Sequence, residues 1–280
     1  MPQLPRFLPA SGYDPENAKG RVRYIVRALQ RSYPNARTAL TYSSCFELLV
    51  ATILSAQCTD EVVNRVTPKL RERYPTPEAL AGANPSDVEA TIRPTGFFRQ
   101  KTKAIVGSAR KIVEDFGGEL PRTMAELTSL PGVARKTANV VLANCHPRPA
   151  SDHGIFVDTH IRRISQRLAL TPNEDPVKIE QDLMALLPKH AWVDIPHALI
   201  LLGRGPCKAR KPDHEGCPLL RWCPTGLAAQ GAAVPTQAPR RVARARSDVR
   251  AKPKRRPTPE GAPKAHPDAG GTSRANPRRT

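Results

Sequence analysis

The stretch from Leu130 to Leu142 constrains the fold of this chain more than any other part of the sequence. It reads Leu-Pro-Gly-Val-Ala-Arg-Lys-Thr-Ala-Asn-Val-Val-Leu. Pro131 and Gly132 favour a tight turn, in which Gly132 can adopt a positive φ and let another molecule approach the backbone. A helix is predicted to start just after the turn, near Val133 or Ala134. The residues spaced for one buried face of that helix are Val133, Thr137, Val140 and Val141.

A short helix from Met124 to Leu130 is predicted to precede the turn, so that the unit is helix, hairpin, helix. The first backbone N–H groups of the second helix have no partner inside it and lie at the positive end of its dipole. Such a helix start binds phosphate. We expect this unit to hold DNA without reading its sequence. The residues expected to contact DNA here are Gly132, Val133, Ala134 and Thr137.

Lys136 and Asp158 are candidate catalytic residues. An exposed lysine keeps its proton, with a pKa of about 10.4, but a partly closed pocket beside a helix N-terminus disfavours the charged form. A neutral amine suits attack on a sugar carbon with Schiff-base formation, and Asp158 can take up the proton or stabilise a cation. The structural alternatives are a solvated lysine and an aspartate that caps the helix after it.

These strings resemble the endonuclease III family of DNA glycosylases and abasic-site lyases. The hairpin string and Val157-Asp158-Thr159-His160 carry the resemblance, together with the segment from Phe46 to Asp60. The resemblance extends from about Ala18 to Cys223. It implies a bifunctional enzyme of base excision repair that removes oxidised pyrimidines from duplex DNA. In that reaction Lys136 would attack the sugar C1′, and β-elimination would follow.

The resemblance also implies which residues enter the DNA. Gln57 matches the residue that fills the gap left by an extruded base, and Phe97 matches an apolar residue that wedges the opposite strand. The structural alternatives are that Gln57 caps a helix end and that Phe97 belongs to the core. Ala134 replaces a family glycine, and its methyl group is expected to weaken phosphate binding modestly.

Two other functions remain open at this point. A monofunctional, adenine-type glycosylase of the same superfamily lacks the lysine, so Lys136 argues against it. A non-catalytic DNA-binding protein would keep the hairpin without the chemistry.

Composition supports a nucleic-acid partner. The chain has 280 residues and a net charge of +19, which suits a polyanion. A membrane surface is the weaker alternative, because no basic amphipathic helix is paired with a lipid anchor. No apolar run reaches the roughly 18 residues that a membrane span requires. The N-terminus carries no apolar signal region, so secretion is not indicated and we expect a cytoplasmic protein, associated with the nucleoid if it is bacterial. We also expect a monomer. Its partner would be double-stranded DNA with damaged bases or abasic sites.

The fold class is predicted to be all-α, because helical periodicity recurs and no alternating strand pair appears. We expect a flexible segment over residues 1–18. By resemblance, residues 38–151 form a six-helix barrel domain that contains the helix-hairpin-helix. Residues 19–37 and 152–224 would form a second helical domain, with DNA held between the two. The connection from Asn144 to Ile155 is about four residues longer than in the family and is expected to be a surface loop.

The six cysteines divide into two groups. Cys45, Cys58 and Cys145 lie in apolar helical stretches and are expected to be small core residues. The other three match the first, third and fourth positions of the family's four-cysteine iron–sulfur motif, and a histidine occupies the second. The resemblance therefore implies a [4Fe-4S] cluster with Cys3His ligation; Zn²⁺ or no metal are the alternatives. The expected ligands are Cys207, His214, Cys217 and Cys223. Lys208 and Arg210, in the loop that follows Cys207, are expected to touch the DNA backbone.

The last segment, residues 225–280, is rich in Pro, Ala and Arg. Its 13 Lys and Arg against 3 Asp and Glu give a charge of +10, about half of the excess of the whole chain. It has too few large apolar residues to order itself, so we expect a disordered basic tail. A salt-sensitive DNA tether is the functional version of that expectation.

Overall fold

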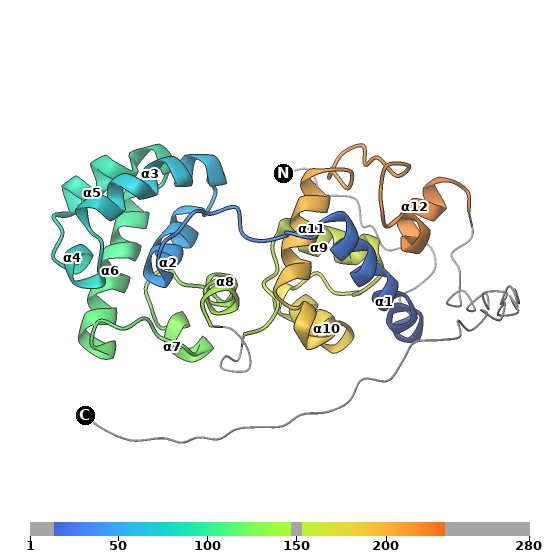
Figure 1. Ribbon diagram of the computed structural model, residues 1–280, viewed down its shortest axis with the longest axis horizontal. Helices are drawn as coiled ribbons and strands as arrows, with labels where there is room; N and C mark the ends of the chain where they lie inside the picture. Colours follow the sequence, from blue (N-terminus) through green and yellow to red (C-terminus); the bar gives the residue numbers. More distant parts are fainter. Residues whose placement is uncertain (1–13, 147–152, 233–280) are drawn as a thin grey trace, which may run out of the picture. The chain divides into compact units, whose positions relative to one another are not determined.

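The computed structural model describes residues 14–146 and 153–232, and these ranges contain helices and no strand (Figure 1). They belong to one compact unit that spans residues 1–238. The prediction of an all-α fold is confirmed. The α-helices are α1 (Pro15–Ser32), α2 (Cys45–Leu54), α3 (Asp60–Arg73), α4 (Pro77–Ala81), α5 (Pro85–Ile92), α6 (Phe98–Phe116), α7 (Met124–Thr128), α8 (Arg135–Cys145), α9 (Thr159–Arg167), α10 (Pro176–Leu186), α11 (Asp194–Arg204) and α12 (Pro224–Ala229). Short 3-10 helices cover Arg93–Thr95, Lys189–Ala191 and Leu220–Trp222.

Most of these helices begin at a side chain that caps them. Asp14 accepts hydrogen bonds from the backbone N–H groups of Glu16 and Asn17, and Pro15 is the first residue of α1. Because Asp-Pro is a strong start signal, α1 begins within the segment expected to be flexible, and the boundary at residue 18 was wrong. Residues 1–13 lie outside the described ranges.

The hydrophobic residues form two clusters. We call the first the central core; it consists of buried side chains between Leu40 and Leu142. The second, the terminal core, combines buried side chains of residues 18–36 with those of residues 155–223. The helix that follows the hairpin, α8, contributes to both: Val141 belongs to the central core, whereas Val140 belongs to the terminal core.

The central core is built on α2. Eight consecutive residues of this helix, from Glu47 to Leu54, are buried, as expected for a helix that is apolar nearly all round. The long helix α6 packs beside it and ends at Phe116; its C-cap, Gly117, has a φ of +61°, the left-handed conformation in which glycine often terminates a helix.

Cys45 and Cys145 form a disulfide, with their Cα atoms 5.7 Å apart. The expectation that both are small core residues was therefore wrong. Periodicity placed each cysteine on its own helix, but it could not show that the start of α2 meets the end of α8, 100 residues away in sequence. Cys58 is a free, half-buried cysteine, so its placement on the central core was closer to the structure.

The C-terminal end of the described chain is also more ordered than expected. Apart from its first residue, Pro224, helix α12 lies inside the range assigned to a disordered tail. Thr225 donates to the backbone oxygen of Arg167 over 2.9 Å, and the N–H of Gly226 points to Cys223 Sγ over 3.4 Å. These local bonds hold a segment that has few large apolar residues. The predicted tail from residue 233 onward lies outside the described ranges, as do residues 147–152 of the predicted loop. The prediction of a surface loop was wrong at both ends of that connection, because Asn144 and Cys145 belong to α8 and residues 153–155 are buried.

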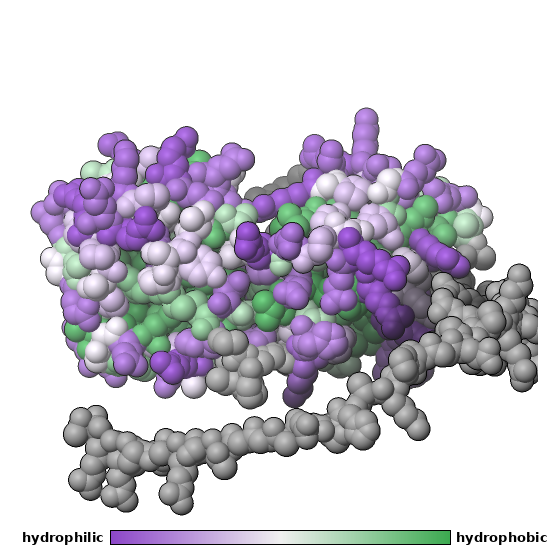
Figure 2. All heavy atoms as spheres, in the orientation of Figure 1, coloured by the Kyte–Doolittle hydropathy of each residue, from purple (hydrophilic) through white to green (hydrophobic). Residues whose placement is uncertain are grey.

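The surface drawn in Figure 2 is mostly hydrophilic, with smaller hydrophobic areas between the charged side chains. Among the described residues, no helix is both long and apolar enough to span a bilayer.

Candidate functional site

The hairpin before α8 has the predicted geometry. Gly132 has a φ of +75°, and the backbone N–H of Val133 bonds to the oxygen of Leu130 over 3.1 Å. A Cβ placed on Gly132 would lie 2.6 Å from the Cβ of Ala104 on α6. The position therefore requires glycine twice, for its backbone angle and for its close packing. Val133 is 6% exposed and anchors the turn in the central core.

Residues of α6 that the sequence did not single out hold this hairpin in place. The hydroxyl of Ser108 donates to the oxygen of Pro131 over 2.7 Å. Gly107 faces the ring of Pro131, whose Cγ lies 3.3 Å from where a Cβ would be. Ala104, Gly107 and Ser108 recur at helical spacing as small residues, and this is the signal that could have identified the seat of the hairpin.

Helix α8 begins at Arg135, one or two residues later than predicted, because Ala134 is in an extended conformation and occupies the N-cap position. No side chain caps this helix. Lys136 and Thr137 lie in its first turn, the former exposed and the latter half-buried. The predicted buried face is correct for Val140 and Val141, and Ala138 takes the place expected for Thr137.

Lys136 is exposed rather than enclosed, and no described residue forms a hydrogen bond or ion pair with its Nζ. The lysine that burial does affect is Lys101 on α6, which is 5% exposed and whose pKa is lowered by desolvation. Its Nζ donates to the backbone oxygens of Leu54 and Thr95, over 2.8 and 2.7 Å. The sequence did not indicate this engaged lysine.

Asp158 caps α9. One of its carboxylate oxygens accepts the backbone N–H of Ile161 over 2.8 Å, so the N-cap alternative is confirmed for that oxygen. Burial lowers the pKa of nearby His197 to about 4, and the charge of Asp158 opposes this shift. Burial likewise lowers the pKa of His160, again against the charge of Asp158. In the described chain no hydrogen bond or ion pair joins Asp158 to Lys136.

Gln57 and Phe97 share an unusual backbone conformation. Their φ angles are +52° and +48°, in the left-handed region that non-glycine residues occupy at a cost of about 1–2 kcal/mol. Both side chains are exposed, Phe97 by 59%. Phe97 is therefore no core residue. Gln57 caps no helix either, because Ser55 is the C-cap of α2 and Thr59 is the N-cap of α3.

Lys101 connects the loops that carry these two residues. Leu54 closes α2 three residues before Gln57, and Thr95 lies two residues before Phe97. One buried ammonium bonds to a carbonyl in each place.

Arg93 and Arg99 flank Phe98, with their guanidinium carbons 5.6 and 5.7 Å from its ring centre.

The cysteine-rich segment lies against α9. The guanidinium of Arg167 donates to Cys207 Sγ over 3.3 Å and to the backbone oxygens of Lys208 and Ala209. Burial raises the pKa of the Cys223 thiol to about 11 and also raises the pKa of Cys217.

The expected metal ligands are near one another but do not form a closed site. The charge of Cys207 contributes to the raised pKa of both Cys217 and Cys223. His214 Nδ1 lies 3.1 Å from where a Cβ on Gly226 would be, and Gly226 also contacts Cys223. Even so, no group of three or more His, Cys, Asp or Glu side chains in the described ranges is arranged to hold a metal ion. Lys208 and Arg210, the predicted DNA contacts, are exposed.

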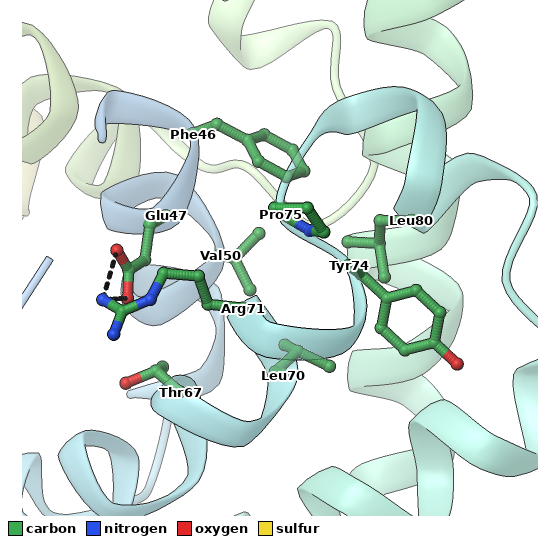
Figure 3. A pocket seen from close by; sticks show the side chains of 9 residues that line it. All are labelled: Phe46, Glu47, Val50, Thr67, Leu70, Arg71, Tyr74, Pro75 and Leu80. Carbon is green, nitrogen blue, oxygen red and sulfur yellow. Dashed lines mark hydrogen bonds and ion pairs between the residues drawn. The ribbon is translucent and has the colours of Figure 1, made fainter. Parts of the chain in front are cut away.

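A small pocket lies elsewhere in the central core, between α2, α3 and α4 (Figure 3). Arg71 and Glu47 form an ion pair at its edge, with Arg71 Nη1 3.1 Å from Glu47 Oε1. Neither Lys136 nor Asp158 lines this pocket. The predicted chemistry and the pocket therefore belong to different places in the structure.

Comparison with known proteins agrees with the fold and the hairpin. Residues 50–189 match the HhH-GPD superfamily of base excision DNA repair proteins. Endonuclease III of Synechocystis sp. is 51% identical over 210 residues, which cover 75% of this chain and 94% of the relative. Endonuclease III of Escherichia coli is 39% identical over 199 residues, covering 71% of this chain and 92% of the relative.

Among solved structures, a trapped covalent intermediate of an endonuclease III with DNA is similar, with a TM-score of 0.70 and 38% identity. The match covers 76% of this chain and 98% of that chain. A non-covalent endonuclease III–DNA complex matches equally well. The hairpin, the helical fold and these similarities together show that the chain belongs to the endonuclease III family of the HhH-GPD superfamily of base excision DNA repair proteins.

Proposed function

We propose that this chain is a bifunctional DNA glycosylase and abasic-site lyase that acts on oxidised pyrimidines in duplex DNA. The observation that carries the proposal is the exposed Lys136 in the first turn of α8, directly after a hairpin whose glycine is required by geometry. An uncapped helix start leaves backbone N–H groups for a phosphate, and the lysine stands beside them.

The reaction uses two groups of this chain. Lys136 first gives a proton to Asp158, and its neutral Nζ then attacks C1′ of the extruded nucleotide. The bond from C1′ to the base breaks, and the base leaves with the proton that the attacking nitrogen loses. The sugar ring opens to a Schiff base on Lys136. Loss of a proton from C2′ then breaks the bond from C3′ to its phosphate oxygen. The carboxylate oxygen of Asp158 that caps no backbone group takes up the amine proton and stabilises positive charge on the sugar.

The remaining site residues hold the DNA in this proposal. Gly132, Ala134 and Thr137 bind one phosphate through backbone N–H groups and a hydroxyl. Val133, whose N–H bonds within the turn, anchors the hairpin that presents them. Gln57 fills the gap in the stack, and Phe97 wedges the opposite strand. Their exposure and left-handed backbone support this assignment, since strained residues gather at functional sites. Lys208 and Arg210 add contacts to the DNA backbone.

We also propose that the two cores correspond to two domains, residues 38–151 and residues 19–37 with 152–224. Members of the endonuclease III family bind an iron–sulfur cluster. In this chain Cys207, His214, Cys217 and Cys223 supply donors of the right kind for a [4Fe-4S] cluster, with Zn²⁺ as the alternative metal. The nearness of the three thiols and the contact of His214 with Gly226 support a structural cluster. Visible absorption with iron and zinc analysis of freshly purified protein distinguishes the two metals from none.

Borohydride reduction in the presence of abasic-site duplex tests the reaction. The wild-type protein should form a covalent adduct, and Lys136→Ala should form none. Lys69→Ala removes an exposed lysine of α3 and should trap normally. An adduct in Lys136→Ala would overturn the assignment of the nucleophile. Binding without an adduct in the wild type would indicate a non-catalytic DNA-binding protein. A panel of duplexes, each with one oxidised pyrimidine, then defines the substrate.

A further inference from the structure

One buried carboxylate bonds to both segments that carry the proposed chemistry. Glu180 of α10 is 3% exposed. Arg135 donates to it twice, from Nε over 2.6 Å and from Nη2 over 3.1 Å. The side-chain amide of Asn139 donates to Glu180 Oε1 over 2.9 Å. A charge this deeply buried is stable only when such donors surround it.

Asn139 extends the network to the segment before Asp158. Its amide oxygen accepts the backbone N–H of Gly154 over 2.7 Å. Gly154 itself lies against the carboxylate: a Cβ there would overlap Glu180 Oε1 and would lie 3.0 Å from the sulfur of Met184. The network therefore joins α8, α10 and residues 153–157 through the buried side chains of Asn139 and Glu180, with the half-exposed Arg135 at its edge.

The positions of these residues along the chain connect the network to Lys136 and Asp158. Arg135 directly precedes Lys136 in the first turn of α8, and Asn139 follows one turn later on the same face. Gly154 is four residues before Asp158, and the chain between them is short. One carboxylate thus fixes the start of the helix that carries Lys136 and the segment that leads to Asp158.

We propose that Glu180 is a positioning residue that sets where Lys136 stands relative to Asp158. It touches neither the DNA nor the reacting atoms; it acts through Arg135 and Asn139. This inference rests on the proposed function. Rates of reactions between held groups fall steeply with displacement, so that a shift of about 1 Å costs up to about 100-fold. DNA affinity depends on many phosphate contacts and responds far less.

Glu180→Gln tests the inference, because it removes the charge and keeps the volume. Three quantities are measured: the single-turnover rate of borohydride-trapped adduct formation with abasic-site duplex, the affinity for duplex that contains a tetrahydrofuran abasic analogue, and the melting temperature. We expect the trapping rate to fall about 10- to 100-fold. Affinity for the analogue, which cannot form a Schiff base, should change less than about 3-fold.

The matched control is Glu47→Gln. Glu47 is also buried, and it also pairs with a half-exposed arginine, Arg71. Its other partner is Ser43, so it bonds to neither the hairpin helix nor the approach to Asp158. Glu47→Gln is therefore expected to lower the melting temperature while the trapping rate stays within about 2-fold of wild type.

Asn139→Asp combined with Glu180→Gln provides a rescue. The carboxylate moves to position 139, where it accepts from Gly154 and from the new amide at 180, whose oxygen still accepts from Arg135. We expect this double variant to trap at least about ten times faster than Glu180→Gln. Gly154→Ala, which pushes a methyl group into the same carboxylate, should slow trapping while keeping every charge.

The outcomes separate the two proposals. If the wild type forms no adduct, the proposed function fails. If the wild type traps and Glu180→Gln traps at the same rate, the positioning role of Glu180 is overturned and the proposed function stands. A rate loss in Glu180→Gln that Glu47→Gln reproduces would also overturn it, since it would then reflect general destabilisation.

Discussion

The central and terminal cores stabilise their polar groups in different ways. In the central core, buried Glu47 of α2 pairs with Arg71 of the adjacent helix α3, and a disulfide joins the start of α2 to the end of α8. In the terminal core, buried arginines donate to backbone oxygens far away in sequence. Arg21 bonds to the oxygens of Leu168, Ala169 and Trp222. Lys101 makes a contact of the same kind in the central core, where it donates to the oxygen of Leu54. Among the described residues the two cores therefore differ chiefly in the disulfide, which belongs to the central core.

The two tryptophans allow these regions to be followed separately. Trp192 is buried in the terminal core, and the partly buried Trp222 packs against that core. The chain has no other tryptophan. Fluorescence therefore reports unfolding of the terminal core, whereas circular dichroism reports loss of helix in both.

The largest expected effect is on the central core alone. Cys45→Ser removes a disulfide that spans 100 residues, which the chain-entropy relation values at about 4–5 kcal/mol. We expect the dichroism transition to move to lower urea concentration while the fluorescence transition of the terminal core moves little. Cys58→Ser, which removes a free cysteine, is the control. Equal shifts in both signals would mean that the cores unfold together.

Arg21→Met should have the converse effect. The arginine is 6% exposed, and its removal leaves three backbone oxygens without their donor. Each unsatisfied group costs about 1–3 kcal/mol, so a loss of at least about 3 kcal/mol is expected in the fluorescence-detected transition. Arg27→Met, at an exposed position of the same helix, should change that transition little. A loss confined to dichroism would contradict the comparison.

Acid should weaken the terminal core through His197. Its pKa is about 4 in the folded chain because burial disfavours the charged imidazolium, and about 6.5 in the unfolded chain. The unfolded state therefore binds more protons below pH 6.5, and stability falls as the pH drops from about 6.5 to 4, by about 3 kcal/mol at the lower limit. His197→Gln should flatten this dependence in the fluorescence signal. His190→Gln, at an exposed position, should not.

The two regions also differ in how far the sequence predicted them. The hairpin was predictable because a Pro-Gly turn followed by a periodic apolar helix is a local pattern, and Gly132 has the expected φ. The sequence left open whether Lys136 is exposed and whether Asp158 caps a helix. Only the folded structure could decide each question.

What the sequence could not predict are contacts between distant segments. The partners of Glu180 lie 45 and 41 residues away, and those of Lys101 lie 47 and 6 residues away. A buried glutamate or lysine on an amphipathic helix has no periodicity of its own. The disulfide was missed for the same reason, because helical spacing places a sulfur on a face without naming its partner.

The ammonium group of Lys101 has a mechanical consequence. It donates to backbone oxygens shortly before Gln57 and shortly before Phe97, so one side chain anchors the backbone near both residues. On the proposed function, the residue that enters the vacated stack and the residue that splits the complementary strand advance into the duplex together. Gln57 and Phe97 would then enter the DNA in a single step, and a duplex that blocks one of these side chains would block the other as well.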